Sequence, residues 1–292
     1  MLRPRSRVPD WVRSLMSNPV SIAGMVIVLC FILIAILAPV LAPPPVPSEP
    51  FQVPRDGFQA EPLPPSAKHI LGTTQGQYDI FYGIVWGTRT AFEIGIVVTG
   101  LTVLIGGLLG AISAYAGGWV DETIQRVVEI VLAFPFLLAA LVLATVLASK
   151  IHNGLLTGMI ALTAFGWPTY SRLIRGDVLS VKERDYVLAA RILFRHILPN
   201  SIYSLLVVGS LDIGTYVLTF AALSFLGLGA GEGYADWGQL LSYARNWIPS
   251  LAQFWYIVVF PGAALLLFVL GFNLIGDAFR DALDPKMRGN RA

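Results

Sequence analysis

The amino-acid sequence predicts an all-α, polytopic membrane protein with six transmembrane helices. Composition is the first observation behind this fold class: 55% of the 292 residues are hydrophobic and only 13% are charged, whereas soluble domains carry about 25% charged residues. The second is a series of apolar runs, several of them near the ~20 residues that a helix needs to cross ~30 Å of hydrocarbon. A net charge of +2 gives no electrostatic support for binding nucleic acid.

The chain begins with a polar cytoplasmic tail, residues 1–21, that carries four arginines. The first apolar run, residues 22–41, is too long for the hydrophobic part of a typical signal peptide, and a Pro-rich segment follows it instead of a small-residue cleavage site. We therefore expect a retained first transmembrane helix. Residues 42–88 are expected to form an extracytoplasmic loop, because the prolines in this segment exclude a long helix.

Residues 89–276 form the predicted core, with five further helices. Gly106 and Gly110 have the small-xxx-small spacing that lets two helices approach closely. Pro135 lies inside the third helix, where a kink is tolerated only among packed neighbours. A short polar turn is expected at residues 117–125, an extracytoplasmic loop at 226–253 and a charged cytoplasmic tail at 277–292. The five helices are expected to run over Thr90–Tyr115, Val127–Ala148, Leu155–Tyr170, Ile202–Leu223 and Phe254–Ile275.

The distribution of lysine and arginine predicts the orientation of these helices. If the N-terminus lies in the cytoplasm, the segments on that side hold 15 of the 20 Lys and Arg residues. Cytoplasmic segments of membrane proteins carry such an excess. Both termini and the charged stretch between the fourth and fifth helices are therefore expected to face the cytoplasm.

That central stretch, residues 171–200, is the most charged part of the chain and holds six of the Lys and Arg residues. Its apolar residues recur at helical spacing, which predicts an amphipathic helix at the membrane surface that a partner protein can grip. No glycine lies between Arg191 and Pro199, so the pattern predicts one continuous helix up to Pro199.

The run Asp185-Tyr-Val-Leu-Ala-Ala-Arg191, followed by Phe194-Arg-His-Ile-Leu-Pro-Asn200, resembles the "EAA" loop of ABC importer membrane subunits. The chain departs from that family at Leu188, where Glu is usual, and after Arg191, where the family has a longer segment with a turn glycine. The resemblance covers about residues 22–286 and points to the oligopeptide and dipeptide permease branch. The other matching pieces are His69-Ile-Leu-Gly-Thr73, Gly117-Gly-Trp-Val-Asp-Glu122, Ala133-Phe-Pro135, Leu223-Ser-Phe-Leu-Gly-Leu-Gly229, Phe272-Asn-Leu-Ile-Gly-Asp277 and Arg280-Asp-Ala-Leu-Asp-Pro285.

The resemblance implies a type I ABC importer permease fold and a permease subunit that forms half of a translocation path for di- or oligopeptides. The implied partners are a second homologous permease, two cytoplasmic ABC ATPase subunits and an extracytoplasmic substrate-binding protein, all at the plasma (inner) membrane of a prokaryote. It also implies that the outer loop folds against the transporter from His69 onward; a solvated spacer is the alternative. The residues implied to couple to the ATPase are Asp185, Tyr186, Ala189, Ala190, Arg191, Arg195 and Pro199.

No cofactor, metal or catalytic activity is expected in this chain. It has no G-x-x-x-x-G-K-[ST] run, so ATP would be bound by the partner subunits. The three histidines are scattered and lack metal-site spacing. The G-x-S-x-G motif of serine hydrolases is absent as well, so the chain is not expected to be an enzyme.

Three acidic residues, Glu93, Glu129 and Asp212, lie within predicted membrane helices. A carboxylate in hydrocarbon must face a cavity or a partner, so all three are candidates for the translocation path. Glu93 and Glu129 are also explained by positions near helix ends or by bonds to neighbouring helices. Asp212 lies deepest, and a cationic group such as a peptide amino terminus is its natural partner.

Three aromatic residues, Trp237, Tyr243 and Trp247, lie in the otherwise polar loop 226–253. They suit either a membrane-interface belt or a docking surface for the binding protein. Two alternatives to peptide import by an ABC transporter stay open: a secondary transporter driven by an ion gradient, and an ABC permease for nickel or an oligosaccharide.

Overall fold

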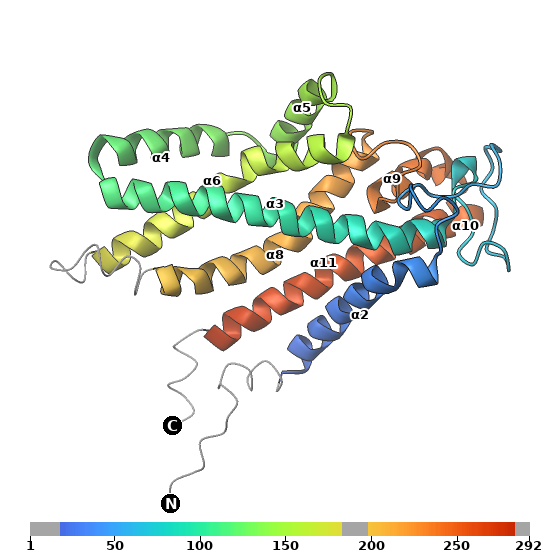
Figure 1. The fold of residues 1–292 in the computed structure, drawn as a ribbon, viewed down its shortest axis with the longest axis horizontal. Coiled ribbons are helices and arrows are strands. Elements are labelled where there is room, and N and C mark those ends of the chain that lie inside the picture. The colour runs from blue at the N-terminus through green and yellow to red at the C-terminus, as the bar shows by residue number, and fades with distance from the viewer. Residues whose placement is uncertain (1–17, 183–197, 284–292) are drawn as a thin grey trace, which may run out of the picture.

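The computed structural model describes residues 18–182 and 198–283, and within these ranges the chain is helical, with only isolated β-bridges in its loops. Figure 1 shows the long helices running lengthwise through the molecule. They are α2 (Pro19–Leu41), α3 (Ile80–Ala116), α6 (Gly154–Lys182), α8 (Leu198–Phe225) and α11 (Tyr256–Leu283). The shorter elements are α4 (Gly118–Leu132), α5 (Phe136–Ala148), α9 (Trp237–Tyr243), α10 (Leu251–Phe254) and the 3-10 turns η1 (Gln75–Gln77) and η3 (Arg245–Ser250).

The all-α prediction is confirmed for the described residues, but the count of six membrane helices is not. In those residues, α2, α3, α8 and α11 contain stretches long and apolar enough to cross a membrane. The pair α4 and α5 passes the same criteria only when taken together as one broken span. Four or five spans therefore follow from length and composition, and six remains a prediction.

The second long helix, α3, begins ten residues before the predicted start, because a local capping signal lies upstream. The side chain of Asp79 accepts a hydrogen bond from the backbone N–H of Tyr82 at 2.8 Å, which satisfies one of the free donors of the first turn. Tyr82 and Trp86 are then buried against the outer loop. Helix α3 therefore extends into the segment expected to be loop, and the non-helical part of that loop ends at Asp79.

The prediction of one kinked helix over Val127–Ala148, preceded by a polar turn, is also wrong. Helix α4 already begins at Gly118, and α4 and α5 meet at an angle of 89°. Pro135 directly precedes α5 as its N-cap residue. Proline has no N–H for a helical bond and is tolerated at a helix start, so the helix breaks here instead of bending.

The helices before and after the central stretch, α6 and α8, differ from the prediction where they adjoin it. Helix α6 contains Pro168 within its length and does not stop at Tyr170 but continues to Lys182. Pro199 lies in the first turn of α8, where a missing N–H costs nothing, rather than at the end of a helix. Residues 183–197 lie outside the described part of the chain.

The close approach of two helices predicted from Gly106 and Gly110 is confirmed, and the partner is α6. A Cβ atom added at Gly106 would collide with the backbone oxygen of Trp167, and one at Gly110 would collide with the backbone of Ser171. Because both obstacles are backbone atoms, the contact requires glycine at these positions.

The outer loop is folded along residues 42–79, not only from His69 onward, so it is not a solvated spacer. Its backbone pairs with the loop before α9: Val53 N–H donates to Gly233 O at 2.7 Å, and Ala235 N–H donates to Phe51 O at 2.7 Å. The side chain of Trp86 donates to Ala42 O at 2.8 Å. These bonds join both outer loops and α3 into one structure at one end of the helices (Figure 1).

Candidate functional site

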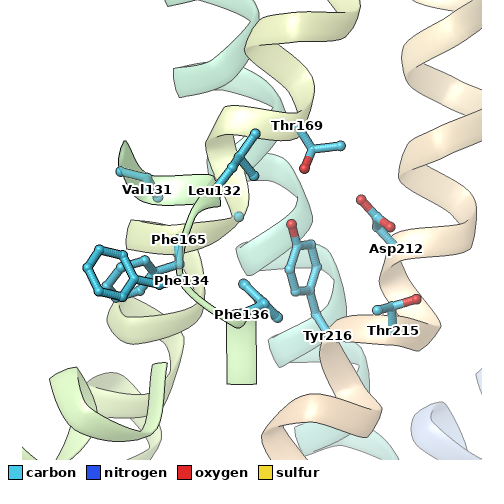
Figure 2. Close-up of a pocket in the computed structure, with 10 residues that line it drawn as sticks. Val131, Leu132, Phe134, Phe136, Phe165, Thr169, Asp212, Thr215 and Tyr216 are labelled. Carbon is cyan, nitrogen blue, oxygen red and sulfur yellow. The ribbon is translucent and has the colours of Figure 1, made fainter. Parts of the chain in front are cut away.

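A pocket of about 180 Å³ lies where the α4–α5 break faces α6 and α8 (Figure 2). Aromatic and aliphatic side chains form much of its wall, and Asp212 is the acidic residue among those that line it. Figure 2 shows Phe134 and Phe165 on one side and Asp212 and Tyr216 on the other. The residues that line it are Val131, Leu132, Phe134, Phe136, Phe165, Gly166, Thr169, Asp212, Thr215 and Tyr216.

The carboxylate of Asp212 is held by a side chain from the neighbouring helix. Tyr170, which is fully buried in α6, donates its hydroxyl proton to Asp212 Oδ2 at 2.6 Å. A carboxylate has about four acceptor positions, so this bond leaves capacity for a further donor. A half-buried carboxylate beside aromatic rings is suited to bind a cationic group by charge and by cation–π contact.

The shape of the pocket depends on the break in the α4–α5 pair and on a glycine in α6. Phe134 and Phe136 flank Pro135, so the sharp turn there places both rings at the pocket. A Cβ atom at Gly166 would collide with the hydroxyl of Tyr216, so glycine allows that tyrosine to lie against α6.

The three acidic residues expected in one path do not come together. Glu129 is exposed on α4, where it pairs with Arg126 at 3.0 Å. Glu93 is exposed on α3 and is not among the residues that line the pocket. Of the three, Asp212 alone lines the pocket, and the structure gives Glu129 an ordinary surface partner.

Two features of the site could not be identified from the sequence. Tyr170 is separated from Asp212 by 42 positions, and no local pattern links them. The aromatic residues of the wall lie in apolar runs that also predict plain lipid-facing surface. The signal that came nearest was the Ala133-Phe-Pro135 motif, which marks the break but not what faces it.

Of the residues expected to couple to an ATPase, Asp185, Tyr186, Ala189, Ala190, Arg191 and Arg195 lie outside the described residues. The structure describes the backbone on both sides of them: α6 leads into the segment at Lys182, and α8 leads out of it from Leu198. Pro199 belongs to the first turn of α8.

The three aromatic residues of the outer loop point inward in the structure. Trp237 is only 2% exposed and packs against Phe31 and Phe268 with ring centroids 5.8 and 5.5 Å apart. Tyr243 stacks on Tyr78 at 5.0 Å, and Trp247 packs edge-on against Phe254 at 4.6 Å. The side chain of Trp237 is therefore part of the protein core and offers almost no surface to a docking protein.

No group of three or more His, Cys, Asp or Glu side chains that could hold a metal ion is found in residues 18–182 and 198–283.

Comparison with known proteins places the chain in a family. Residues 106–289 match the binding-protein-dependent transport system inner membrane component family, and residues 6–62 match the N-terminal TM domain of oligopeptide transport permease C. The two matches together include the first described helix, α2, and the last, α11.

Individual relatives agree with this match. The chain is similar to the dipeptide transport system permease protein of Alkalihalophilus pseudofirmus, with 40% identity over 94% of this chain and 89% of the relative. It is 36% identical to the oligopeptide transport system permease protein of Bacillus subtilis, over 93% of this chain and 87% of the relative. It is 39% identical to the glutathione transport system permease protein of Pectobacterium atrosepticum, over 77% and 75%. The chain therefore belongs to the family of binding-protein-dependent transport system inner membrane components.

Proposed function

We propose that this chain is a membrane-spanning permease subunit of an ATP-driven importer and forms half of a translocation path for di- or oligopeptides. The observation that carries the proposal is the similarity of nearly the whole chain to a permease named for dipeptide transport. The pocket at the α4–α5 break gives this role a place in the chain, because it combines aromatic walls with one carboxylate.

The proposal includes six membrane crossings with both termini in the cytoplasm. Helices α2, α3, α8 and α11 supply four crossings, the bent pair α4–α5 the fifth, and α6, which packs against α3 through Gly106 and Gly110, the sixth. The folded outer loops then lie outside the cell. The excess of Lys and Arg in the segments on the other side supports this orientation.

Cysteine labelling tests the orientation. In a chain without Cys30, cysteines at Ala60 and at Ile248, both exposed positions of the outer loops, should react with an impermeant reagent in intact cells. A cysteine at Lys182 should react only after permeabilisation. Labelling at Lys182 from outside would overturn the proposed topology.

Asp212 is proposed to contact the cationic amino terminus of a peptide during its passage. Its carboxylate lines the pocket and accepts one bond from Tyr170, and the adjoining Thr215 and Tyr216 add polar groups to the same wall. The aromatic residues opposite suit the mixed apolar side chains of peptides, which a permease for many sequences must accept.

The proposed partners are a second homologous permease, two cytoplasmic ATPase subunits that bind ATP, and an extracytoplasmic binding protein. The segment from Asp185 to Arg195, called the coupling segment below, is proposed to dock on an ATPase subunit. The outer loops, which expose Phe58, Ile70 and Ile248, are proposed to receive the binding protein. Trp237 supports that surface from within, because it joins α9 to Phe31 of α2 and Phe268 of α11.

Reconstitution of the chain with its partner subunits in liposomes tests the function. Uptake of a radiolabelled dipeptide should require both ATP and the binding protein, and should persist when ionophores abolish ion gradients. Uptake that needs an ion gradient but no ATP would overturn the proposal in favour of a secondary transporter. Transport of nickel or an oligosaccharide, with no competition by peptides, would overturn the substrate class.

A further inference from the structure

Three helices meet at Asp121, in the first turn of α4. Arg175 of α6 donates two hydrogen bonds to this carboxylate, Nε to Oδ1 at 2.6 Å and Nη2 to Oδ2 at 2.6 Å. Ser113 of α3 donates its hydroxyl proton to the same carboxylate, and Gln125 of α4 donates to Ser113 Oγ at 3.0 Å. A bidentate arginine–carboxylate pair fixes orientation as well as distance, so α4 and α6 are joined in one geometry.

The ends of the ion pair are partly shielded from water. The side chain of Arg175 is 31% exposed and that of Asp121 is 20% exposed. The other pairs on the same helix, between Arg126 and the acids Glu122 and Glu129, have side chains that are 52% to 72% exposed. An exposed pair contributes ~0–1 kcal/mol, whereas a shielded bidentate pair holds its helices more firmly.

Most of helix α4 is exposed in the described part of the chain. Among its fifteen residues, Val128 is the only one that is buried. The connection from α3 is a reversal at Gly117 and Gly118, whose positive φ angles of 63° and 52° favour glycine. Beyond this reversal, α4 is tied to α3 by the bonds of Asp121 and Gln125 to Ser113 and to α6 by the two bonds from Arg175, so the Asp121 cluster fixes where the helix lies relative to α6.

Both helices of the Arg175–Asp121 pair also reach the pocket that contains Asp212, and α6 leads toward the coupling segment as well. The C-terminal part of α4, at Val131 and Leu132, lines the pocket. Helix α6 lines the pocket with Phe165 and Thr169 and holds Asp212 through Tyr170. The same helix passes Arg175 and ends at Lys182, shortly before the coupling segment. Arg175 therefore stands between that segment and the pocket on one continuous helix.

From this arrangement we propose that the Arg175–Asp121 pair transmits displacement of the Lys182 end of α6 to α4, and so opens or closes the pocket wall at the α4–α5 break. The inference rests on the proposed function as an ATP-driven permease. Arg175 and Asp121 are positioning residues here, since neither lines the pocket that contains Asp212. Each movement of α6 carries α4 with it only while both bonds to the carboxylate hold.

Conservative variants in the reconstituted complex test the proposal. Arg175→Lys keeps the charge but cannot form the paired bonds, and Asp121→Asn keeps the size but removes the charge. Each should leave the ATPase subunits bound and stimulated by loaded binding protein, while peptide transported per ATP hydrolysed falls about fivefold or more. The exchanged pair Asp121→Arg with Arg175→Asp should recover part of that ratio. Arg126→Gln, which removes the exposed pairs on the same helix, should leave the ratio unchanged.

A second measurement separates transmission from simple stability. Spin labels on exposed positions of α4 and α6, at Val127 and Arg172, should keep a constant separation on ATP binding in the wild type and move apart in Arg175→Lys. Equal losses of ATP hydrolysis and transport, with an unchanged ratio and an unchanged separation, would overturn the proposal. A wild-type complex that shows no ATP-dependent peptide uptake would instead overturn the proposed function.

Discussion

Arg89 donates a hydrogen bond from Nε to the backbone oxygen of Ala35 at 2.6 Å, and that oxygen is the one that Pro39 leaves without its helical donor. In a regular helix the N–H of residue 39 would bond to residue 35, but proline has no N–H. The guanidinium of Arg89 replaces it from α3 and lies 4.9 Å from the ring centroid of Trp86. A proline inside α2 is thus compensated by an arginine on its neighbour, as membrane helices require.

This relationship predicts that Arg89 and Pro39 are energetically coupled. Arg89→Gln should lower the unfolding free energy in mixed micelles by about 1–3 kcal/mol, because a carbonyl in an apolar setting loses its charged donor. In a Pro39→Ala background the restored helical N–H can serve Ala35, so Arg89→Gln should cost clearly less. Equal costs in both backgrounds would show that Arg89 does not act through this carbonyl.

Asp212 is expected to be required for transport but not for assembly. Asp212→Asn keeps an acceptor for Tyr170 and removes the charge, so uptake should fall roughly tenfold, the value of one charged hydrogen bond, while partner subunits still co-purify. Tyr170→Phe is the matched control because it removes the partner and keeps the carboxylate. Normal uptake by Asp212→Asn would assign Asp212 a structural role only. Asp212→Leu tests that role, since loss of assembly in this variant would identify the contact with Tyr170 as an interhelical bond.

The outer loop should lose stability as the pH rises, because of His69. Both ring nitrogens face carboxylates, Nδ1 to Asp79 at 2.7 Å and Nε2 to Asp56 at 2.8 Å, and two such bonds require a protonated ring. Burial alone lowers the pKa of His69, but the bonds to Asp79 and Asp56 outweigh it, so the pKa is raised above its usual value.

The sign of the pH effect follows from this direction. A raised pKa in the folded state means that the stabilisation is fully present below the unfolded value of about 6.5 and is lost as the pH rises through the folded value. Proteolysis of the loop should therefore be faster at high pH than near neutrality. In His69→Gln the same assay should show no such change over that range; a persistent change would implicate another group.

The contact of α3 with α6 predicts different outcomes for neighbouring glycines. Gly110→Ala should destabilise the chain by about 1–3 kcal/mol or prevent its folding, because the new methyl group meets the backbone of Ser171. Gly107→Ala is the control, since a Cβ there would meet no atom within 4 Å in the described residues other than those of its own stretch of helix. Expression and thermal unfolding in detergent measure both, and equal behaviour of the two variants would contradict the packing.

The coupling segment offers a further test, although it lies outside the described residues. Ala189→Trp or Ala190→Trp should leave the chain folded and inserted but reduce the recovery of ATPase subunits, because a large side chain cannot enter a groove shaped for alanine. Recovery of the ATPase in pull-downs and peptide uptake measure the effect. If alanine serves only as a good helix former there, both variants transport normally.

Local patterns in the sequence were sufficient for part of this description. The apolar runs identified the regions of α2, α3, α8 and α11, because membrane helices satisfy their backbone bonds internally and need only length and hydrophobicity. The spacing of Gly106 and Gly110 identified a helix contact, and the motifs from His69 to Pro285 identified the family.

Other features depended on residues that are distant in the chain. Pro135 signalled a disruption, but the sequence did not predict the angle of 89° between α4 and α5. Trp237 lies in a polar stretch of sequence typical of an exposed loop. It is buried because Phe31 and Phe268, from two other helices, pack against it. Glu93, Glu129 and Asp212 looked alike as acids in apolar runs, yet burial and partners separate them.

The sequence by itself determined that this protein is a helical membrane permease of a known family, because hydrophobic length and short motifs are properties of contiguous residues. The tertiary structure alone decided that Tyr170 holds Asp212, that Arg175 joins α6 to α4, and that Arg89 completes the helix interrupted by Pro39. The two residues in each of these contacts are 42 to 54 positions apart in the chain. The choice among many possible partners at such separations is made by the packing of whole helices, which no local pattern records.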